Sequence, residues 1–459
     1  MKILPQPFLS PEAGIYVGML LLLLGAPVAV AYADTIHMPH TGMSQAPAMD
    51  RGGAPGANLM NLLELMRQNN PELATLRHEA AMAVERIYPA GAFADPLLER
   101  ELEIDNPSVN EADLLNQLLT GAPPTEGPRG GSIKYRIYQD FPFWGKRDLK
   151  REIAAADADQ FKGRSDKLWT EMAARMKGAF AQYYRIVRVE ALTREILELF
   201  ADLERITLKR YADGLAPQQD VIRAQTEQTR TRTELVGIET DRRNWQYRIN
   251  SMLKRLSNDP LAQPDAPRAL PGTAKLDYLA LVERMKARNP QIFIADAGIT
   301  YADKTRDLTY RNRWPDASIG ATTIYASSKF QLWGLYARVN IPIQLERRRS
   351  QEREAEEMFL AAKTARAGVE NQLLSDLSEN LAQLEAARET ERLARTSLVP
   401  QAELTYRAAL AGYQTSKVDF AVLLEAQRQI RNAKLEQLKS EAEGQVRLAE
   451  IERLVGEDL

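Results

Sequence analysis

Residues 138–160 read YQDFPFWGKRDLKREIAAADADQ, and the chain changes character within a few positions of this stretch. An apolar and aromatic run reaches Pro142, after which basic residues lead into an alanine-rich, charged segment. A proline has no backbone N–H to donate, so it ends the hydrogen bonding of a strand. The stretch therefore predicts a strand up to Phe141 that passes directly into a helix, and nothing in it is typical of catalysis.

The same junction occurs twice in the chain. FPFWGKR, starting at 141, corresponds to IPIQLERRR, starting at 341, with an offset of 200 residues. RQNNPELATL pairs with KARNPQIFIA at an offset of 219, and RYADGLAPQQDVIRAQ pairs with GYQTSKVDFAVLLEAQ at an offset of 202. An ordered set of such pairings indicates an internal repeat. The larger first offset predicts extra residues in the first copy, which we place in the Pro- and Gly-rich segment 106–131, an expected loop.

The pairings also predict how the chain is divided. Lys2 precedes an apolar run that ends in AYA at 31–33, the small-residue pattern of a cleaved signal peptide. A transmembrane anchor is the alternative for this run. The predicted parts are a signal peptide (1–33), a flexible His- and Met-containing tail (34–54), a first repeat (55–258), a Pro-rich linker (259–272) and a second repeat (273–456).

Each repeat is expected to contain a helix, two strands, a long helix, a tight turn and a last helix. A helix of about 68 residues is on the order of 100 Å long. Such a length, with heptad-like apolar spacing, is typical of coiled coils, and a soluble coiled-coil rod is the alternative. The expected helices are 57–88, 145–212 and 217–256, then 274–310, 345–412 and 417–456; the expected strands are 96–105, 132–141, 317–326 and 334–343.

The strands favour a membrane barrel over a soluble rod. They have about the length of a tilted membrane-spanning strand, and apolar residues alternate with polar ones, as in a barrel with a polar lumen. Because lipid does not tolerate an open sheet edge, several chains must share the barrel. The positions expected to face the lumen are Glu99, Glu101, Glu103, Asp105, Lys134, Arg136 and Arg338; the aromatic residues expected at the membrane interface are Phe141, Phe143 and Trp144.

The duplicated junctions, together with the duplicated turns YADGLAPQQDV and YQTSKVDFAVLLEAQ, resemble the TolC-like outer-membrane efflux proteins. The resemblance extends over 55–456. It implies a mixed, mainly α fold: a homotrimeric outer-membrane factor with a shared twelve-stranded β-barrel, four strands per chain, and a long periplasmic α-helical coiled-coil barrel. It implies a channel in the outer membrane of a Gram-negative bacterium, with outer-membrane lipid, a periplasmic adaptor protein and an inner-membrane pump of the resistance-nodulation-division type as partners.

Two shorter stretches bear on the cargo. YPAGAFADP (88–96) and RNRWPDAS (311–318) are similar to the heavy-metal branch, the CzcC/CusC-type channels. Heavy-metal cations are therefore the favoured cargo, and small organic compounds or peptides are the alternative. Some family members carry a lipid on a cysteine. This chain has no cysteine, so it lacks an anchor of that kind.

The resemblance also places the periplasmic gate and the adaptor-docking surface at the two hairpin turns. In a trimer, each acid near the turns would form a ring of three carboxylates, which attracts cations. Acids favoured by a helix N-terminus are the alternative. The implied docking residues are Tyr211, Gly214, Leu215, Tyr413 and Ser416; the candidate gate or selectivity residues are Asp220, Asp419 and Glu425.

The tail after the cleavage pattern contains a second candidate site. Thioether and imidazole ligands suit Cu(I) or Ag(I), whereas a flexible polar tail is the alternative. The possible ligands are His37, Met38, His40, Met43 and Met49.

Composition excludes several other classes of function. A net charge of −2 argues against a nucleic-acid-binding surface. The lack of cysteine excludes disulfides and a cysteine nucleophile. No catalytic triad, P-loop or zinc signature occurs, so we expect neither an enzyme nor a cofactor. The alternative of another class is a structural periplasmic coiled-coil protein, and the strands in matching places of both repeats argue against it.

Overall fold

The computed structural model describes residues 55–103, 119–120, 132–326 and 329–459. They belong to the compact unit Gly53–Leu459. The expected signal peptide, the His/Met tail, Asp105 and nearly all of segment 106–131 lie outside the described residues.

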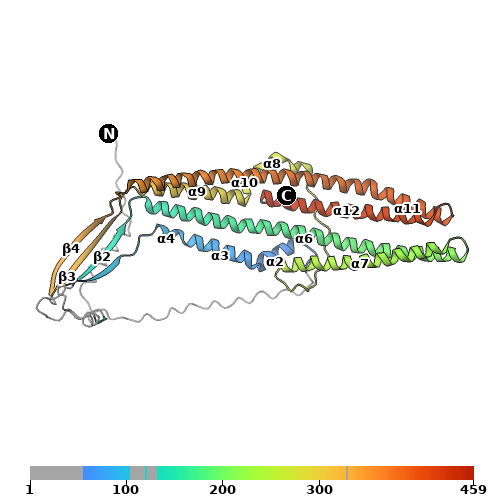
Figure 1. The fold of residues 1–459 in the computed structure, drawn as a ribbon, viewed down its shortest axis with the longest axis horizontal. Helices are drawn as coiled ribbons and strands as arrows, with labels where there is room; N and C mark the ends of the chain where they lie inside the picture. Colours follow the sequence, from blue (N-terminus) through green and yellow to red (C-terminus); the bar gives the residue numbers. More distant parts are fainter. Residues whose placement is uncertain (1–54, 104–118, 121–131, 327–328) are drawn as a thin grey trace. The chain divides into compact units, whose positions relative to one another are not determined.

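Helices and strands occur in a similar order in the two halves of this unit (Figure 1). The first half contains α2 (Leu59–Asn69), α3 (Pro71–Glu85), α4 (Ile87–Gly91), β1 (Leu97–Glu103), β2 (Ser132–Phe141), α6 (Lys146–Ala212) and α7 (Gln218–Met252). The second contains η1 (Thr273–Leu276), α8 (Tyr278–Arg288), α9 (Pro290–Arg311), β3 (Ala317–Ala326), β4 (Lys329–Val339), α10 (Leu345–Leu393), η2 (Ala394–Leu398), α11 (Val399–Gln414) and α12 (Phe420–Val455). No helix among the described residues is both long and apolar enough to cross a membrane.

The first helix of each half is broken, so the single helices expected at 57–88 and 274–310 were wrong. The break falls at Asn70 and at Asn289, each followed by a proline. A residue before proline is pushed away from helical geometry, and an asparagine there caps the next helix. Each asparagine side chain accepts from backbone N–H groups of the following turn, at 2.9 Å from Glu72 and 2.7 Å from Gln291.

The same asparagines also tie each broken helix to the last helix of its half. The Asn289 amide donates to the Leu454 carbonyl at 2.7 Å, and the Asn70 amide donates to the Met252 carbonyl at 3.4 Å. Because both asparagines are buried, losing these bonds leaves carbonyls at the ends of α7 and α12 without that partner.

Asn289→Ala is expected to lower the free energy of unfolding by about 1–3 kcal/mol, the sum of a lost cap and a lost buried hydrogen bond. Asn70→Ala should lower the free energy of unfolding by less, because the hydrogen bond from the Asn70 amide to the Met252 carbonyl is longer. The urea midpoint of the helical circular dichroism signal measures both. Equal losses of stability in the two variants would show that the hydrogen bonds from the asparagine amides to Met252 and Leu454 do not differ in strength.

The long helices differ between the halves. α6 is continuous over 67 residues, as expected. The helix expected at 345–412 is interrupted by the π-helical turn η2, which is followed by Pro400 in the first turn of α11. A proline lacks an N–H and its ring clashes with the carbonyl four residues earlier, and a π turn is a usual way to accommodate such a defect. The second long helix therefore contains a defect that the first lacks.

The strands form one antiparallel sheet in the order β1-β2-β3-β4. β2 and β3 have the predicted bounds. The predicted bounds of β4 were wrong, because the strand starts at Lys329 rather than at 334 and ends at Val339 rather than at 343. Val339 pairs with Ala317, the first residue of β3, so the ladder ends there. Ile341 and Ile343, on either side of Pro342, belong to the link into α10.

The register separates a polar face from an apolar one, since directly paired residues point to the same side of a sheet. Glu99 pairs with Arg136, and Arg136 pairs with Thr322. Glu103, a further predicted lumen position, pairs with Ser132. The opposite face includes Leu98, Leu102, Ile133, Tyr135, Ile137, Ile319, Leu335 and Val339. Arg100, which falls among them, lies with its guanidinium 5.9 Å from the centre of the Tyr135 ring.

Candidate functional site

The polar face of the sheet is joined by cross-strand ion pairs. The guanidinium of Arg136 lies 3.1 Å from Glu99 and 3.1 Å from Glu101. The Tyr138 hydroxyl donates to Glu99 at 2.8 Å. Arg338 lies 3.8 Å from Asp140, on the same face, and 5.2 Å from the centre of the Tyr138 ring. Pairs of this kind stabilise a register, and they place charges of both signs along one face.

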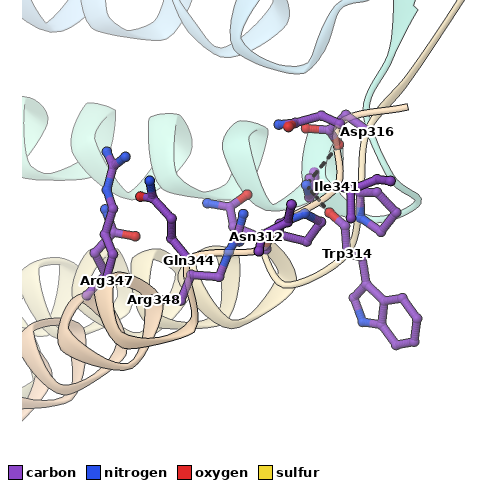
Figure 2. A pocket seen from close by; sticks show the side chains of 13 residues that line it. Asn312, Trp314, Asp316, Ile341, Gln344, Arg347 and Arg348 are labelled. Carbon is purple, nitrogen blue, oxygen red and sulfur yellow. Dashed lines mark hydrogen bonds and ion pairs between the residues drawn. The ribbon is translucent and has the colours of Figure 1, made fainter. Parts of the chain in front are cut away.

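The strand-to-helix junction is held by a buried lysine. Lys146 is 4% exposed, and its Nζ lies 2.8 Å from both the Asp316 carboxylate and the Trp314 carbonyl (Figure 2). The backbone N–H of Phe143 also donates to Asp316, at 2.7 Å. The Lys146 side chain therefore points into the junction. It joins the start of α6 to the start of β3.

Burial alone would raise the pKa of Asp316, but the Lys146 ammonium and the Phe143 N–H outweigh it and hold that pKa below its usual value. A group with a lowered folded pKa contributes stability above its unfolded-state pKa, and loses it as pH falls through the folded value. The junction is therefore expected to hold throughout the neutral range and to weaken only in strong acid.

Asp316→Asn is expected to lower the free energy of unfolding by about 1–3 kcal/mol at neutral pH, because it leaves the buried Lys146 charge without its acid. The half-exposed carboxylate keeps the loss below that of a fully buried pair. Asp148→Asn removes an exposed pair with Arg151 and serves as the control, with an expected loss of about 0–1 kcal/mol. A urea titration at pH 7 compares them, and equal losses would disprove the role of burial.

Aromatic rings from both halves gather at this junction. Phe143 stacks on Trp314, with ring centres 5.1 Å apart, and Phe93 meets Phe141 edge-on at 5.7 Å. Trp144 is almost fully exposed. The aromatic residues expected at the membrane interface, Phe141, Phe143 and Trp144, all come from the first half. Trp314 was not among them, since it precedes β3 instead of following a strand and so falls outside the duplicated motif.

The two hairpin turns share an unusual backbone conformation. Gly214, in the turn between α6 and α7, has φ +70°, and Ser416, in the turn between α11 and α12, has φ +59°. The left-handed region costs a non-glycine residue roughly 1–2 kcal/mol. Arg210 offsets this at Ser416, where its Nη2 lies 2.7 Å from the Oγ. Serine therefore supplies the turn for which glycine would be the usual residue.

A group of four residues joins the two hairpins of one chain, and we call Arg210, Asp220, Tyr413 and Ser416 the hairpin latch. The Tyr413 hydroxyl donates to Asp220 Oδ2 at 3.3 Å, and the Arg210 guanidinium lies 4.8 Å from the centre of the Tyr413 ring. Arg210 Nη1 also donates to the Gln414 carbonyl at 2.7 Å. Tyr413 and Asp220 are both buried. Three of these residues were predicted from the sequence, and Arg210, at the start of RYADGLAPQQDVIRAQ, was missed.

Burial and the neighbouring Asp220 carboxylate raise the pKa of Tyr413 to about 12. Its phenol is therefore protonated at neutral pH and donates to the acid. Burial is also the main cause that raises the pKa of Asp220. Asp220 thus lies inside a contact between hairpins, whereas Asp419 and Glu425, the other two gate candidates, are exposed.

A hollow of about 320 Å³ lies on α11 and α12, lined by Thr405, Ala421, Val422, Glu425, Ala426 and Gln429. At the repeat offset of 202, Thr405, Val422 and Ala426 correspond to Leu203, Asp220 and Ala224. Leu203 and Ala224 belong to the buried cluster that contains Tyr413, whose hydroxyl bonds to Asp220. By the repeat, the hollow on α11 and α12 therefore corresponds to the position that Tyr413 occupies beside Asp220. Tyr413 itself corresponds to Tyr211, which is 46% exposed.

Three of the docking candidates, Tyr211, Gly214 and Leu215, are exposed at the α6–α7 turn, as is Ser416 at the other turn; Tyr413 is buried. Among the described residues, no three histidine or acidic side chains are grouped as a metal site would need. The predicted tail ligands, His37 to Met49, lie outside those residues.

Residues 281–457 match the family described as outer membrane efflux protein. Solved structures share the fold over most of the chain. OprN, an outer-membrane channel, is 17% identical, with a TM-score of 0.71, and the match covers 87% of this chain and 89% of that one. VceC from Vibrio cholerae is 17% identical, with a TM-score of 0.72 and coverage of 87% and 96%. CusC is 15% identical, with a TM-score of 0.74 and coverage of 87% and 92%.

No curated protein matches the sequence. The family match lies in the second half of the chain, and the structural likeness extends over both halves. The protein therefore has the fold of the outer-membrane efflux channels, and residues 281–457 carry the pattern of the outer membrane efflux protein family.

Proposed function

We propose that the protein is the outer-membrane channel of a tripartite efflux system and works as a homotrimer. The sheet carries this proposal, because it has one apolar face, one polar face and two outer strands, β1 and β4. Such edges are not tolerated in lipid unless they pair. Pairing β4 of one copy with β1 of the next, in three copies, closes a barrel of twelve strands whose polar face lines the lumen.

The remaining parts of the fold take their roles from this arrangement. The long helices extend from the barrel into the periplasm, and the hairpin turns form the far end. The latch closes that end within each chain, and the exposed residues of the turns, such as Leu215, contact the periplasmic adaptor. An inner-membrane pump of the resistance-nodulation-division type delivers the cargo.

Heavy-metal cations are the favoured cargo, supported by the stretches 88–96 and 311–318 and their similarity to the CzcC/CusC branch. Small organic compounds are the alternative. The tail residues His37, Met38, His40, Met43 and Met49 are a further candidate for Cu(I) or Ag(I), and titration of a 34–52 peptide against a scrambled control tests them. Sensitivity of a deletion strain to metals and to organic toxicants separates the two classes of cargo.

The channel itself is tested by fractionation and conductance. The protein should be found with outer-membrane proteins, migrate differently in gels when heated, and give discrete conductance steps in a planar bilayer. A protein recovered only in the soluble periplasmic fraction, with no conductance, would instead be a structural coiled-coil protein.

A further inference from the structure

A cavity of about 540 Å³ lies where the end of β4 passes into α10, beside the start of α6 and the end of α9 (Figure 2). Its wall combines cationic, amide and apolar side chains with one acid, Asp316. Lys146, Arg347 and Arg348 are cationic, Asn312 and Gln344 supply amides, and Ile341 is one of the apolar residues. The hairpin latch lies at the other ends of the long helices, so this cavity belongs to a different site.

The positive charge of the cavity exceeds its negative charge. Lys146 is matched by Asp316, as described above. Arg348 donates to the Asn312 carbonyl, which carries no net charge. Arg347 makes no hydrogen bond or ion pair with any residue that the structure describes, and its side chain is exposed. Two guanidinium groups therefore line the cavity, whose one acid, Asp316, is already paired with Lys146.

The neighbouring acids are already paired. Glu352, whose pKa Arg348 helps to lower, is bound through both oxygens by Arg313 at 2.5 Å. Glu346 lies 2.8 Å from Arg349. Neither acid lines the cavity.

The first repeat shows how the same position is used when it serves folding alone. Arg147, the counterpart of Arg347 at the offset of 200, donates to the Gly91 carbonyl at 2.8 Å and covers the Phe93 ring at 3.4 Å. Arg347 has neither kind of contact among the described residues. The fold therefore does not need the Arg347 charge, and the charge is available to a ligand.

We propose that this cavity binds the phosphate of a phospholipid headgroup. A guanidinium matches two phosphate oxygens with a fork of N–H donors, and the uncapped start of α10 adds the positive end of a helix. Free phosphate shares this chemistry, but the rim favours a lipid: Ile341 is 70% exposed and Ile343 is 80% exposed. These side chains lie beside the acyl chains while Arg347 reaches the headgroup.

The proposal rests on the proposed function in one respect, since it needs the sheet to lie in a membrane. The cavity is at the strand ends that continue into the long periplasmic helices, so the lipid comes from the inner leaflet of the outer membrane. A bound headgroup would fix the depth of the barrel at the point where the chain leaves the bilayer.

The test compares Arg347→Gln with Arg349→Gln in full-length protein. Each is reconstituted in bilayers of phosphatidylethanolamine and phosphatidylglycerol and extracted in mild detergent, and bound phospholipid is counted by native mass spectrometry. Wild type and Arg349→Gln should retain lipid, and Arg347→Gln should retain at least about tenfold less. Arg347→Lys keeps the charge without the fork and should fall between them.

Equal lipid retention in Arg347→Gln and Arg349→Gln would overturn the proposal. Binding of added inorganic phosphate, with no retained lipid, would overturn the lipid assignment. Conductance of the same preparations separates this failure from failure of the proposed function, because a protein that conducts normally and binds no lipid contradicts only the cavity's role.

Discussion

Tyr413→Phe is expected to raise the open probability of the channel in planar bilayers by roughly tenfold per chain. The substitution removes one hydroxyl and leaves Asp220 buried without its phenol donor. A hydrogen bond to a charged group contributes about 1.5–3 kcal/mol, and 1.4 kcal/mol is a factor of ten in an equilibrium constant. Because the distance of 3.3 Å is long for a hydroxyl–carboxylate bond, the lower value is appropriate.

Tyr211→Phe is the matched control, since it makes the same chemical change at the corresponding residue of the other hairpin. The Tyr211 hydroxyl makes no hydrogen bond within the part of the chain that the structure describes, so its loss should leave the open probability unchanged. Equal opening in both variants would show that the bond to Asp220 does not hold the hairpins together.

The pH dependence of the latch follows from the raised pKa of Asp220. Burial is the main cause of this rise, and the Asp419 carboxylate adds to it. The hydrogen bond from Tyr413 and the charges of Arg223 and Arg210 lower the pKa in part. A carboxyl with a raised pKa in the closed state favours that state as pH falls through the raised value. Wild type should therefore open less in mild acid. Asp220→Asn is neutral, and its amide oxygen still accepts from Tyr413. The open probability of this variant should therefore be the same at neutral pH and in mild acid.

Tyr211→Ala is expected to cause most of the trimer to dissociate in detergent. Because the repeat relates Tyr211 to Tyr413 and Val422 to Asp220, we expect Tyr211 of one copy to occupy the hollow at Val422 of the next, as Tyr413 contacts Asp220 within a chain. Val422 is 50% exposed in a single chain, and truncating a buried aromatic anchor at an interface costs about 2 kcal/mol or more. Three such contacts per trimer multiply the effect.

Size-exclusion chromatography with light scattering measures that dissociation. Tyr211→Phe keeps the ring and should remain trimeric, as should Leu208→Ala, which truncates another exposed apolar side chain of α6. A stable Tyr211→Ala trimer would show that this contact is not needed for assembly and that the shared barrel is enough to hold three copies together.

The two contacts differ in chemistry although the repeat relates them. Asp220 and Arg210 make the contact within a chain polar. Their counterparts at the contact that we expect between chains are Val422 and Gly412, which carry neither charge. We therefore expect salt and pH to act mainly on the latch within each chain.

Much of the fold follows from local sequence. The bounds of β2 and β3 were predicted to the residue, since Pro142 ends β2 and Pro315 precedes β3. The breaks at Asn70 and Asn289 were missed although each asparagine precedes a proline, because apolar spacing continues across them. The early start of β4 was missed because the register is set by pairing with β3, which no single segment contains.

The candidate sites were harder to predict, because their residues act through distant partners. In the sequence Asp220 has the pattern of an ordinary acid near a helix N-terminus. Its partner Tyr413 is 193 residues away in the chain, so the sequence does not indicate their contact. In the sequence Lys146 has the pattern of a surface charge, whereas in the structure it is buried and paired with Asp316. Arg210 begins the stretch RYADGLAPQQDVIRAQ and Trp314 lies in RNRWPDAS, but neither stretch indicates which residues they contact.

Cross-linking between chains shows whether three copies of this chain form one channel, as we propose. The natural sequence has no cysteine, so Tyr211→Cys/Val422→Cys introduces the only two thiols. A short bis-maleimide is suitable, because the tyrosine ring holds the Cα atoms farther apart than a disulfide spans. Tyr413→Cys/Asp220→Cys is the control, which links within one chain. The first pair should give dimers and trimers and nothing larger, while the control should stay monomeric. A first pair that stays monomeric, or a ladder that continues beyond the trimer, would contradict assembly as a trimer.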